Sequence, residues 1–171
     1  MQKAEENSME KLEKDVLAIL NEDCRYSAAK IAVMLGETEE RVQACIHSLE
    51  ARGVIVKYAA IANYEREEDE LVEAFIEVKV TPQKGFGFDG VAEQIARHKE
   101  VKSLYLMSGA YDFAVIIEGK SLRSISRFVS ERISTFDCVL STATHFILKK
   151  YKIEGALTKN ADEERRLSIQ P

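Results

Sequence analysis

The residues best suited to binding a small molecule are Gly109 and Asp112, in the short stretch 108–112. A glycine has no side chain, so the backbone N–H groups beside it can approach a ligand closely. An aspartate carboxylate accepts hydrogen bonds from an ammonium group. Together these groups match the two ends of an amino acid. The same two residues also suit an ordinary turn between two strands, and the residues alone favour that interpretation.

Side chains typical of catalysis or metal binding are scattered along the chain. The three cysteines have no CxxC spacing, which argues against a disulfide framework and a zinc site, and the three histidines have no metal-ligand spacing; these residues are Cys24, Cys45, Cys138, His47, His98 and His145. The sequence has no nucleotide-binding loop, no Cys/His nucleophile arrangement and no obvious catalytic carboxylate pair. We therefore expect no enzyme activity, no catalytic residues, no metal and no cofactor.

Residues 27–53 have the spacing of two short helices joined by a tight turn, a helix-turn-helix. Ser27 and Thr38 are good N-caps for the two helices, while Gly36 and Gly53 end them. Each helix carries an apolar stripe, formed by Ile31, Met34 and Leu35 on the first and by Val42, Cys45, Ile46 and Leu49 on the second. The alternative is an ordinary helical hairpin that does not read DNA.

Length and composition indicate a soluble globular protein. A chain of 171 residues with 46% apolar content can form two small domains with real cores. No apolar run approaches the roughly 20 residues needed to span a bilayer, and the first residues are polar. We therefore expect a cytoplasmic protein without a membrane anchor or a signal peptide.

The charge of the helix-turn-helix half is opposite to that of a typical DNA-binding domain. Residues 1–53 hold 7 Lys and Arg against 11 Asp and Glu, a net charge of −4, and residues 54–171 hold 17 against 18. Phosphate contacts supply most non-specific affinity for DNA, so a strong DNA-binding protein is expected to show a basic face. This half is expected to bind DNA weakly as a single copy.

An amphipathic helix precedes the helix-turn-helix. Its apolar residues repeat at helical spacing from Met9 to Leu20, which predicts a helix over 8–21 capped by Ser8. Packed on the next two helices, it gives a three-helix domain over residues 1–53 with a core of Leu12, Val16, Ile19, Ile31, Leu35, Val42, Ile46 and Leu49. Residues 54–61 are rich in strand formers and suit a wing or a tether strand, and the acidic run 63–70 suits a linker.

The remaining pattern is strand, helix, strand, strand, helix, strand. The strands are predicted at 71–80, 101–107, 112–118 and 139–148, after a glycine-containing loop over 83–87 in the first connection. The first helix has Asp89 near its start, and the second begins after the N-cap Ser121. This order predicts an α+β chain whose second domain, residues 71–150, is a ferredoxin-like βαββαβ sandwich with both helices on one face of the sheet. Most of residues 151–171 is predicted to be a mobile tail, or an arm that becomes ordered only on a partner.

The strand over 112–118 is apolar on both faces, although helices of the same chain can cover only one. A second copy of the chain is the simplest cover for the other face. We therefore predict at least a dimer, formed through the open face of the sheet.

These features occur together in one known family. The helix-turn-helix is followed by the sequence Gly-Val-Ile-Val-Lys-Tyr at 53–58 and by a linker. After the linker come Gly-Ala-Tyr-Asp at 109–112 and Ser-Thr-Ala-Thr at 141–144. In this order the chain resembles the Lrp/AsnC family, the feast/famine regulators, over about residues 9–150. The resemblance implies a winged or helix-turn-helix transcriptional regulator with a RAM-type C-terminal domain, which forms dimers and often octamers. It implies that the strand at 54–61 pairs with the dimer mate.

The resemblance also assigns site residues. It implies that the second helix of the motif enters the major groove of double-stranded DNA, with contacts expected from Lys30, Thr38, Arg41, Gln43, Ala44 and His47, and a phosphate contact from Lys57. It implies that an amino acid or related metabolite binds between C-terminal domains, near Met107, Ser108, Gly109, Ala110, Tyr111, Asp112, Thr142 and Thr144.

Two other functions remain open from the sequence. The acidic recognition helix is compatible with a metabolite-binding oligomer that binds DNA weakly or not at all. The same two-domain plan is found in the siroheme decarboxylases, enzymes that use histidine near the domain interface, but this sequence has no histidine-rich pocket signature. The effector, the operator, the sign of regulation and the oligomer number are not determined by the sequence.

Overall fold

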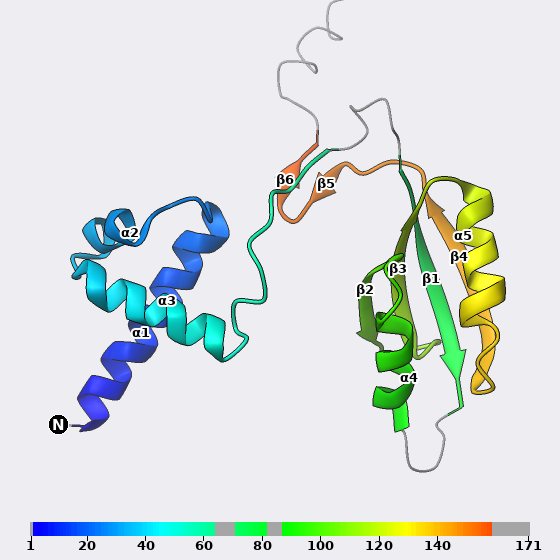
Figure 1. Cartoon of the computed structure of the whole chain (residues 1–171), viewed down its shortest axis with the longest axis horizontal. Helices are drawn as coiled ribbons and strands as arrows, with labels where there is room; N and C mark the ends of the chain where they lie inside the picture. The colour runs from blue at the N-terminus through cyan, green and yellow to red at the C-terminus, as the bar shows by residue number, and fades with distance from the viewer. Residues whose placement is uncertain (1, 64–70, 82–86, 159–171) are drawn as a thin grey trace, which may run out of the picture. The chain divides into compact units, whose positions relative to one another are not determined.

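The computed structural model describes residues 2–63, 71–81 and 87–158, with side chains from residue 7 onward. The chain divides into two compact units, Met1–Ala60 and Ile61–Pro171, each with its own core (Figure 1). The division falls within the predicted tether and acidic linker, of which residues 64–70 lie outside the described part. No helix in the described ranges is long and apolar enough to cross a lipid bilayer.

Three helices build the first unit: α1 (Gln2–Glu22), α2 (Ala28–Leu35) and α3 (Glu39–Ala51). The predicted caps of α2 and α3 are confirmed, because the hydroxyls of Ser27 and Thr38 accept hydrogen bonds from the backbone N–H groups of Lys30 and Arg41, at 3.2 and 3.3 Å. Gly36 ends α2 at φ +69°, the left-handed conformation that permits a sharp exit from the helix.

The core of the first unit joins the apolar faces of its three helices. Its buried residues are Leu12, Val16, Leu20, Ile31, Ala32, Val42, Cys45 and Leu49. Three residues of the predicted core, Ile19, Leu35 and Ile46, are only partly buried and pack at its edge. Met34 was placed on the apolar stripe of α2 by its spacing, and this prediction is wrong: its side chain is exposed. The small side chain of Ala32 is buried there instead.

The start of α1 differs from the prediction. The helix begins at Gln2, so Ser8 is an interior residue and not the N-cap. The Ser8 hydroxyl instead accepts a hydrogen bond from Nη2 of Arg41 at 3.2 Å. The prediction depended on apolar periodicity, which does not extend into the polar residues 2–7 and therefore could not mark where the helix begins.

The segment after α3 is extended but forms no strand. Residues 54–63 belong to none of the strands in the described part of the chain. The segment is nevertheless held near α3, since Ile55 packs against the core and the Tyr58 hydroxyl donates a hydrogen bond to Glu50 at 3.0 Å. Pairing of this segment with a dimer mate stays a prediction.

The second unit has the predicted ferredoxin-like topology. Its main elements are β1 (Val72–Val80), α4 (Gly87–Ala96), β2 (Val101–Leu106), β3 (Phe113–Gly119), α5 (Leu122–Phe128), a π-helical turn η2 (Val129–Ile133) and β4 (Val139–Ile147). The four strands form one antiparallel sheet in the order β2-β3-β1-β4. The Ser121 cap of α5 is confirmed. Asp89 lies in the first turn of α4 and is not its cap, and residues 82–86 of the predicted loop lie outside the described part.

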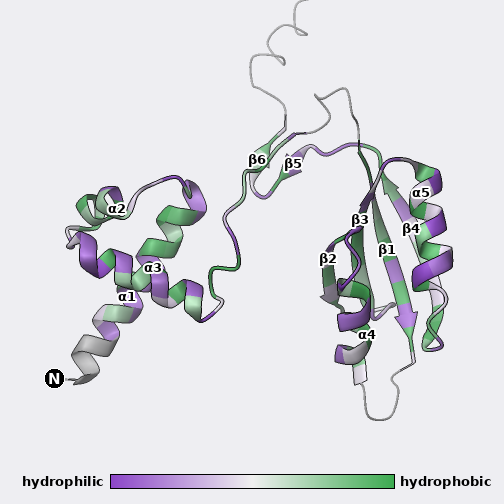
Figure 2. Cartoon of the chain, in the orientation of Figure 1, coloured by the Kyte–Doolittle hydropathy of each residue, from purple (hydrophilic) through white to green (hydrophobic). Residues whose placement is uncertain are grey.

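One face of the sheet forms the core with both helices. Ala74, Ile76, Val78 and Val80 alternate along β1 with polar or half-buried residues, and all four are buried. Figure 2 shows this alternation as bands of hydrophobic and hydrophilic colour along the strand. The same core includes Val91 and Ile95 of α4 and Ile125 of α5. The other face carries no helix of the described chain.

The beginning of the predicted tail is ordered within the chain itself. Two strands of two residues each, β5 (Lys152–Ile153) and β6 (Ala156–Leu157), pair as a short antiparallel hairpin. Glu154 and Gly155, at φ +43° and +86°, provide the positive φ angles that such a tight turn requires. Residues 159–171 of the predicted tail lie outside the described part.

Candidate functional site

The exposed face of α3 includes three of the residues predicted to contact DNA, Gln43, Ala44 and His47, with Glu40 beside them. Glu40, Gln43, Ala44 and His47 are all exposed and follow one another at helical spacing, and we call them the reading face. The opposite side of α3 is fixed in the core by Val42, Cys45 and Leu49. The helix therefore presents an amide, a methyl group and an imidazole to solvent from a rigid support.

Arg41 lies beside the reading face, but its guanidinium already has two partners. Nη1 lies 2.8 Å from Oε2 of Glu37, and Nη2 donates to the hydroxyl of Ser8. These contacts join α1 to the turn between α2 and α3. The predicted contact of Arg41 with a phosphate or a guanine would require it to exchange at least one of these partners.

The other predicted cations of the first unit remain accessible. Lys30 in the first turn of α2 and Lys57 after α3 are exposed, and neither has an ion-pair partner among the described residues. Arg52, in contrast, is bound to Glu13 of α1 at 2.7 Å. Thr38 is committed to capping α3 through its side chain. Of the cations predicted to contact DNA, Lys30 and Lys57 are therefore the two that can bind phosphate without exchanging an ion-pair partner among the described residues.

The turn between β2 and β3 is held to the sheet by Asp112. The backbone N–H of Asp112 donates to the carbonyl of Val78 at 3.1 Å, and its Oδ2 accepts a hydrogen bond from the N–H of Val80 at 2.8 Å. The carboxylate thereby extends the β1–β3 ladder beyond its last backbone bond. The rest of the turn, residues 107–110, is exposed. Gly109 does not have a positive φ, and a Cβ placed there would meet nothing within 4 Å, so the backbone is open to a ligand.

Tyr111, the remaining residue of the turn, lies over the open face of the sheet. Its ring packs edge-on against Phe75 of β1, with centroids 6.0 Å apart. His145 of β4 lies on the other side of Phe75, at 5.9 Å, and its Nε2 is 3.3 Å from Oε1 of Glu77. No motif in the sequence marks this cluster, but the alternation along β1 and β4 is a signal that could have placed Phe75, Glu77 and His145 on one face.

Thr142 and Thr144 are not brought to the turn within one chain. They pair with Val78 and Ile76 of β1, and residues opposite one another in an antiparallel pair share a face, so both threonines point toward the helices. The hydroxyl of Thr142 lies 3.4 Å from that of Ser134. Tyr111 lies on the opposite face, so the predicted effector residues form two groups that are separated by β1.

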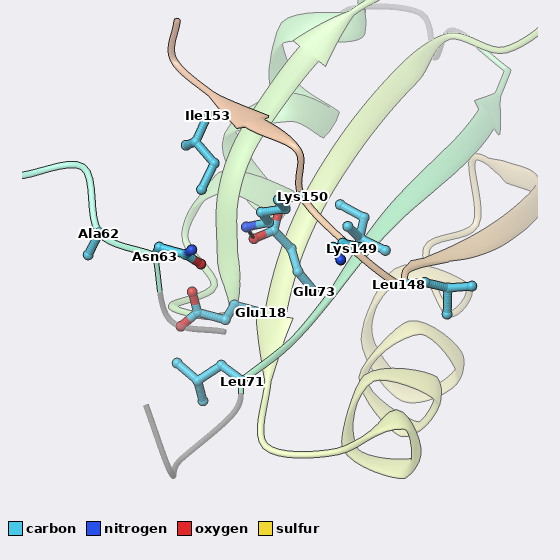
Figure 3. Close-up of a pocket in the computed structure, with 10 residues that line it drawn as sticks. Ala62, Asn63, Leu71, Glu73, Glu118, Leu148, Lys149, Lys150 and Ile153 are labelled. Atoms are coloured by element: carbon cyan, nitrogen blue, oxygen red, sulfur yellow. Dashed lines mark hydrogen bonds and ion pairs between the residues drawn. The ribbon is translucent and has the colours of Figure 1, made fainter. Parts of the chain in front are cut away.

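A small pocket lies where the linker enters the second unit (Figure 3). It encloses about 60 Å³, and Asn63, Leu71, Glu73, Glu118 and Lys150 are among the residues that line it. Lys150 forms an ion pair with Glu73, and the side-chain amide of Asn63 donates to the carbonyl of Thr158 at 3.2 Å. None of the predicted effector residues lines this pocket.

Comparison with known proteins gives consistent results. Residues 73–157 match the Lrp/AsnC ligand binding domain. The HTH-type transcriptional regulator YugG of Bacillus subtilis is 46% identical over 160 residues, which cover 93% of this chain and 96% of that protein. An HTH-type transcriptional regulator of Pyrococcus horikoshii is 32% identical over 139 residues, covering 81% of this chain and 85% of the relative.

Solved structures show the same fold at low sequence identity. The leucine response regulatory protein of Mycobacterium tuberculosis superposes with a TM-score of 0.71 at 22% identity, covering 84% of this chain and 94% of that one. A transcriptional regulator of Neisseria meningitidis, solved as a complex with L-Met, gives a TM-score of 0.65 at 22% identity over 86% of this chain and 94% of its own.

These relatives span both units of the chain and are regulators, not enzymes, which removes the decarboxylase alternative. With a capped helix-turn-helix in the first unit and a ferredoxin-like second unit, the chain belongs to the Lrp/AsnC family of HTH-type transcriptional regulators.

Proposed function

We propose that α3 reads operator DNA in the major groove through Gln43, Ala44 and His47, while Lys30 and Lys57 hold phosphates. The observation that carries this proposal is the exposed reading face on a helix whose other side is buried. An amide such as that of Gln43 can bond both N6 and N7 of adenine, and the methyl group of Ala44 suits the methyl group of thymine. Such a regulator acts where the DNA is, which in a bacterial or archaeal cell is the cytoplasm.

The effector is proposed to be an amino acid or a closely related metabolite, bound between copies of the second unit near residues 107–112. The exposed backbone around Gly109 and the carboxylate of Asp112 support this proposal. The Neisseria relative, whose structure contains L-Met, supports the chemical class. Because the two threonines face the other side of the sheet, a complete site that includes Thr142 and Thr144 would need residues from a second copy.

The regulator is proposed to act as a dimer or an octamer. Phe75, Tyr105 and Ile116 lie on the helix-free face of the sheet, which a second copy would cover. The two helix-turn-helix units of a dimer could then bind DNA half-sites that lie about 34–36 Å apart, or multiples of this distance. An effector regulates DNA binding only if it binds one assembly more tightly than another.

The test is fluorescence anisotropy with the DNA upstream of the protein's own gene, at two salt concentrations. We expect Gln43→Ala to lower operator affinity by about 1–3 kcal/mol, because the bidentate contact with a base is lost. Gln94→Ala, which truncates an exposed glutamine of α4, is the matched control and should leave affinity unchanged. Equal affinities of the two variants would refute the assignment of the reading face.

The second candidate is a metabolite-binding assembly that binds DNA weakly. The observation that favours it is the acidic first unit, with 11 carboxylates against 7 cations over residues 1–53. A thermal-shift screen of free amino acids, run beside the anisotropy measurement, separates the two functions. Stabilisation by an amino acid together with no DNA binding at low salt would establish the second candidate.

A further inference from the structure

A second, larger groove lies on the second unit. One wall is formed by the start of β2 and the end of β3, and the other by α5 and η2. It encloses about 790 Å³, and Leu71, the first described residue after the linker, is part of its wall. Ile117, Ile125 and Phe128 line it among the apolar residues. Its charged residues are Lys99, Lys102, Lys120, Arg123, Arg127 and Arg132, against Glu100, Glu118 and Glu131. We call this the cationic groove.

Most of the positive charge of the cationic groove has no partner within the protein. Lys102 lies 3.2 Å from Glu118, and Arg127 lies 3.6 Å from Glu131. The other four cations, Lys99, Lys120, Arg123 and Arg132, are exposed and have no ion-pair partner in the described ranges. Six cations against three carboxylates leave a surplus of three positive charges in one groove.

The pocket of Figure 3 provides a comparison, because it shares Leu71 and Glu118 with the groove. In that pocket the central cation, Lys150, is neutralised by Glu73. The cations and carboxylates that line that pocket are equal in number, whereas the cationic groove has more cations than carboxylates. Neighbouring cations without carboxylates repel one another, and a bound anionic ligand would reduce this repulsion.

We propose that the cationic groove binds the phosphate backbone of the DNA whose bases α3 reads, an inference that rests on the proposed function. Phosphate contacts provide most of the sequence-independent affinity of a DNA-binding protein, and here the reading domain is acidic. The groove provides the missing cations on the second unit, at the end where the chain arrives from the reading domain. It adds affinity without sequence information, since phosphates are the same in every sequence.

The test uses the full-length double variant Lys120→Gln/Arg123→Gln, measured by anisotropy over a series of salt concentrations. Each lost phosphate contact is expected to reduce the slope of log K against log [salt] by about 0.9. The double variant should therefore lose between about one and two units of slope, with a several-fold loss of affinity at low salt that is equal for operator and scrambled DNA. Gln43→Ala should instead reduce operator binding alone and leave the slope unchanged.

Arg97→Gln is the matched control, because Arg97 is an exposed cation just after α4 that does not line the groove. It should bind DNA as the wild type does. An unchanged slope in the double variant overturns the proposal while leaving the proposed function intact. Wild-type protein that binds no DNA at low salt overturns both.

Two further measurements identify other uses of the groove. Sedimentation velocity should show that the double variant keeps the wild-type assembly, and a changed assembly would make the groove an interface between copies instead. Calorimetry with inorganic phosphate and with ATP tests for free phosphate ligands. Binding of either ligand that is lost in the double variant, with an unchanged DNA slope, would assign the groove to a small anion and overturn the proposal.

Discussion

Asp112 accepts a hydrogen bond within the sheet and is also proposed to bind the effector. Two substitutions can separate these roles. Its Oδ2 accepts the hydrogen bond from the N–H of Val80. Asp112→Ala removes this acceptor and the charge together, so we expect a loss of about 1–3 kcal/mol of unfolding free energy as well as a loss of the effector response. Asp112→Asn keeps an acceptor oxygen for Val80 and removes only the charge.

The asparagine variant is therefore the informative one. We expect urea unfolding to show near wild-type stability, while calorimetry with the amino acid found in the thermal-shift screen shows little or no binding. Asn variants that bind the effector as tightly as wild type would show that Asp112 is a structural residue of the turn and nothing more.

Asp23 gives a prediction about pH. Arg25 donates two side-chain hydrogen bonds and one backbone hydrogen bond to its carboxylate, and these lower the pKa of Asp23 from 3.8 to about 2. Because the pKa is lowered in the folded state, the contribution to stability is fully present above pH 3.8 and is lost as the pH falls through about 2.

An NMR titration of the Asp23 carboxyl carbon should therefore have its midpoint near pH 2. In Arg25→Gln the midpoint should rise, but stay below 3.8, since the backbone N–H of residue 25 still donates. A midpoint that does not move in the variant would show that Arg25 is not the cause.

At the residue scale, the sequence predicted what depends on neighbours along the chain. Ser27, Thr38 and Ser121 could be predicted as caps because a cap bonds a backbone group two or three residues away. The contact of Arg41 with Ser8 could not, because Ser8 lies 33 residues away and meets it only when α1 packs on α3. The separation of Thr142 from Asp112 likewise depends on strand register.

At the scale of elements, the caps determine whether short helices form. α2 has only eight residues, and an isolated helix of that length is unstable in water. We expect Ser27→Ala to lower the unfolding free energy by about 1 kcal/mol, because the N–H of Lys30 loses its acceptor, and Ser27→Asp to restore it. Thermal unfolding followed by circular dichroism measures both, and equal stability of the three proteins would exclude a capping role.

The elements were predictable to the extent that their patterns are periodic. The first strand of the sheet follows from alternation and the third from a short apolar run. The observed ends of β2 and β3 lie close to the predicted ones because Gly119 and the turn at 108–112 interrupt the pattern. The two-residue strands β5 and β6 are too short to show a period. The segment 54–61 has the composition of a strand but lacks a partner in one chain, so composition alone could not determine its state.

At the scale of the whole molecule, the open face of the sheet predicts the assembly. Tyr105 is on this face and is 55% exposed, and Leu122 at the start of α5 is 54% exposed on the helix side. If copies associate through the open face, Tyr105→Gln should weaken the oligomer measurably by sedimentation equilibrium. Leu122→Gln, with equal exposure, is the control and should leave assembly unchanged; a reversed result would place the interface on the helix side.

If one helix-turn-helix unit binds DNA weakly, tight DNA binding requires assembly of several copies. Linking several such units can raise the affinity for DNA by about 10² to 10⁴ without new contacts. Variants that break the oligomer are therefore expected to lose more operator affinity than any single base contact provides. The acidity of the first unit and the free cations of the second unit divide specificity and general affinity between the two parts of the chain.

The antiparallel pairing of β1 with β4 has a mechanical consequence. Glu73 near the start of β1 pairs with Ile147 at the end of β4, so the chain enters and leaves the sheet at the same end. A force applied between Asn63 and Thr158 would first break their own hydrogen bond and then open the β1–β4 ladder one rung at a time. A ladder loaded in this unzipping geometry yields at low force, so tension between the linker and the C-terminal hairpin would peel β4 from β1.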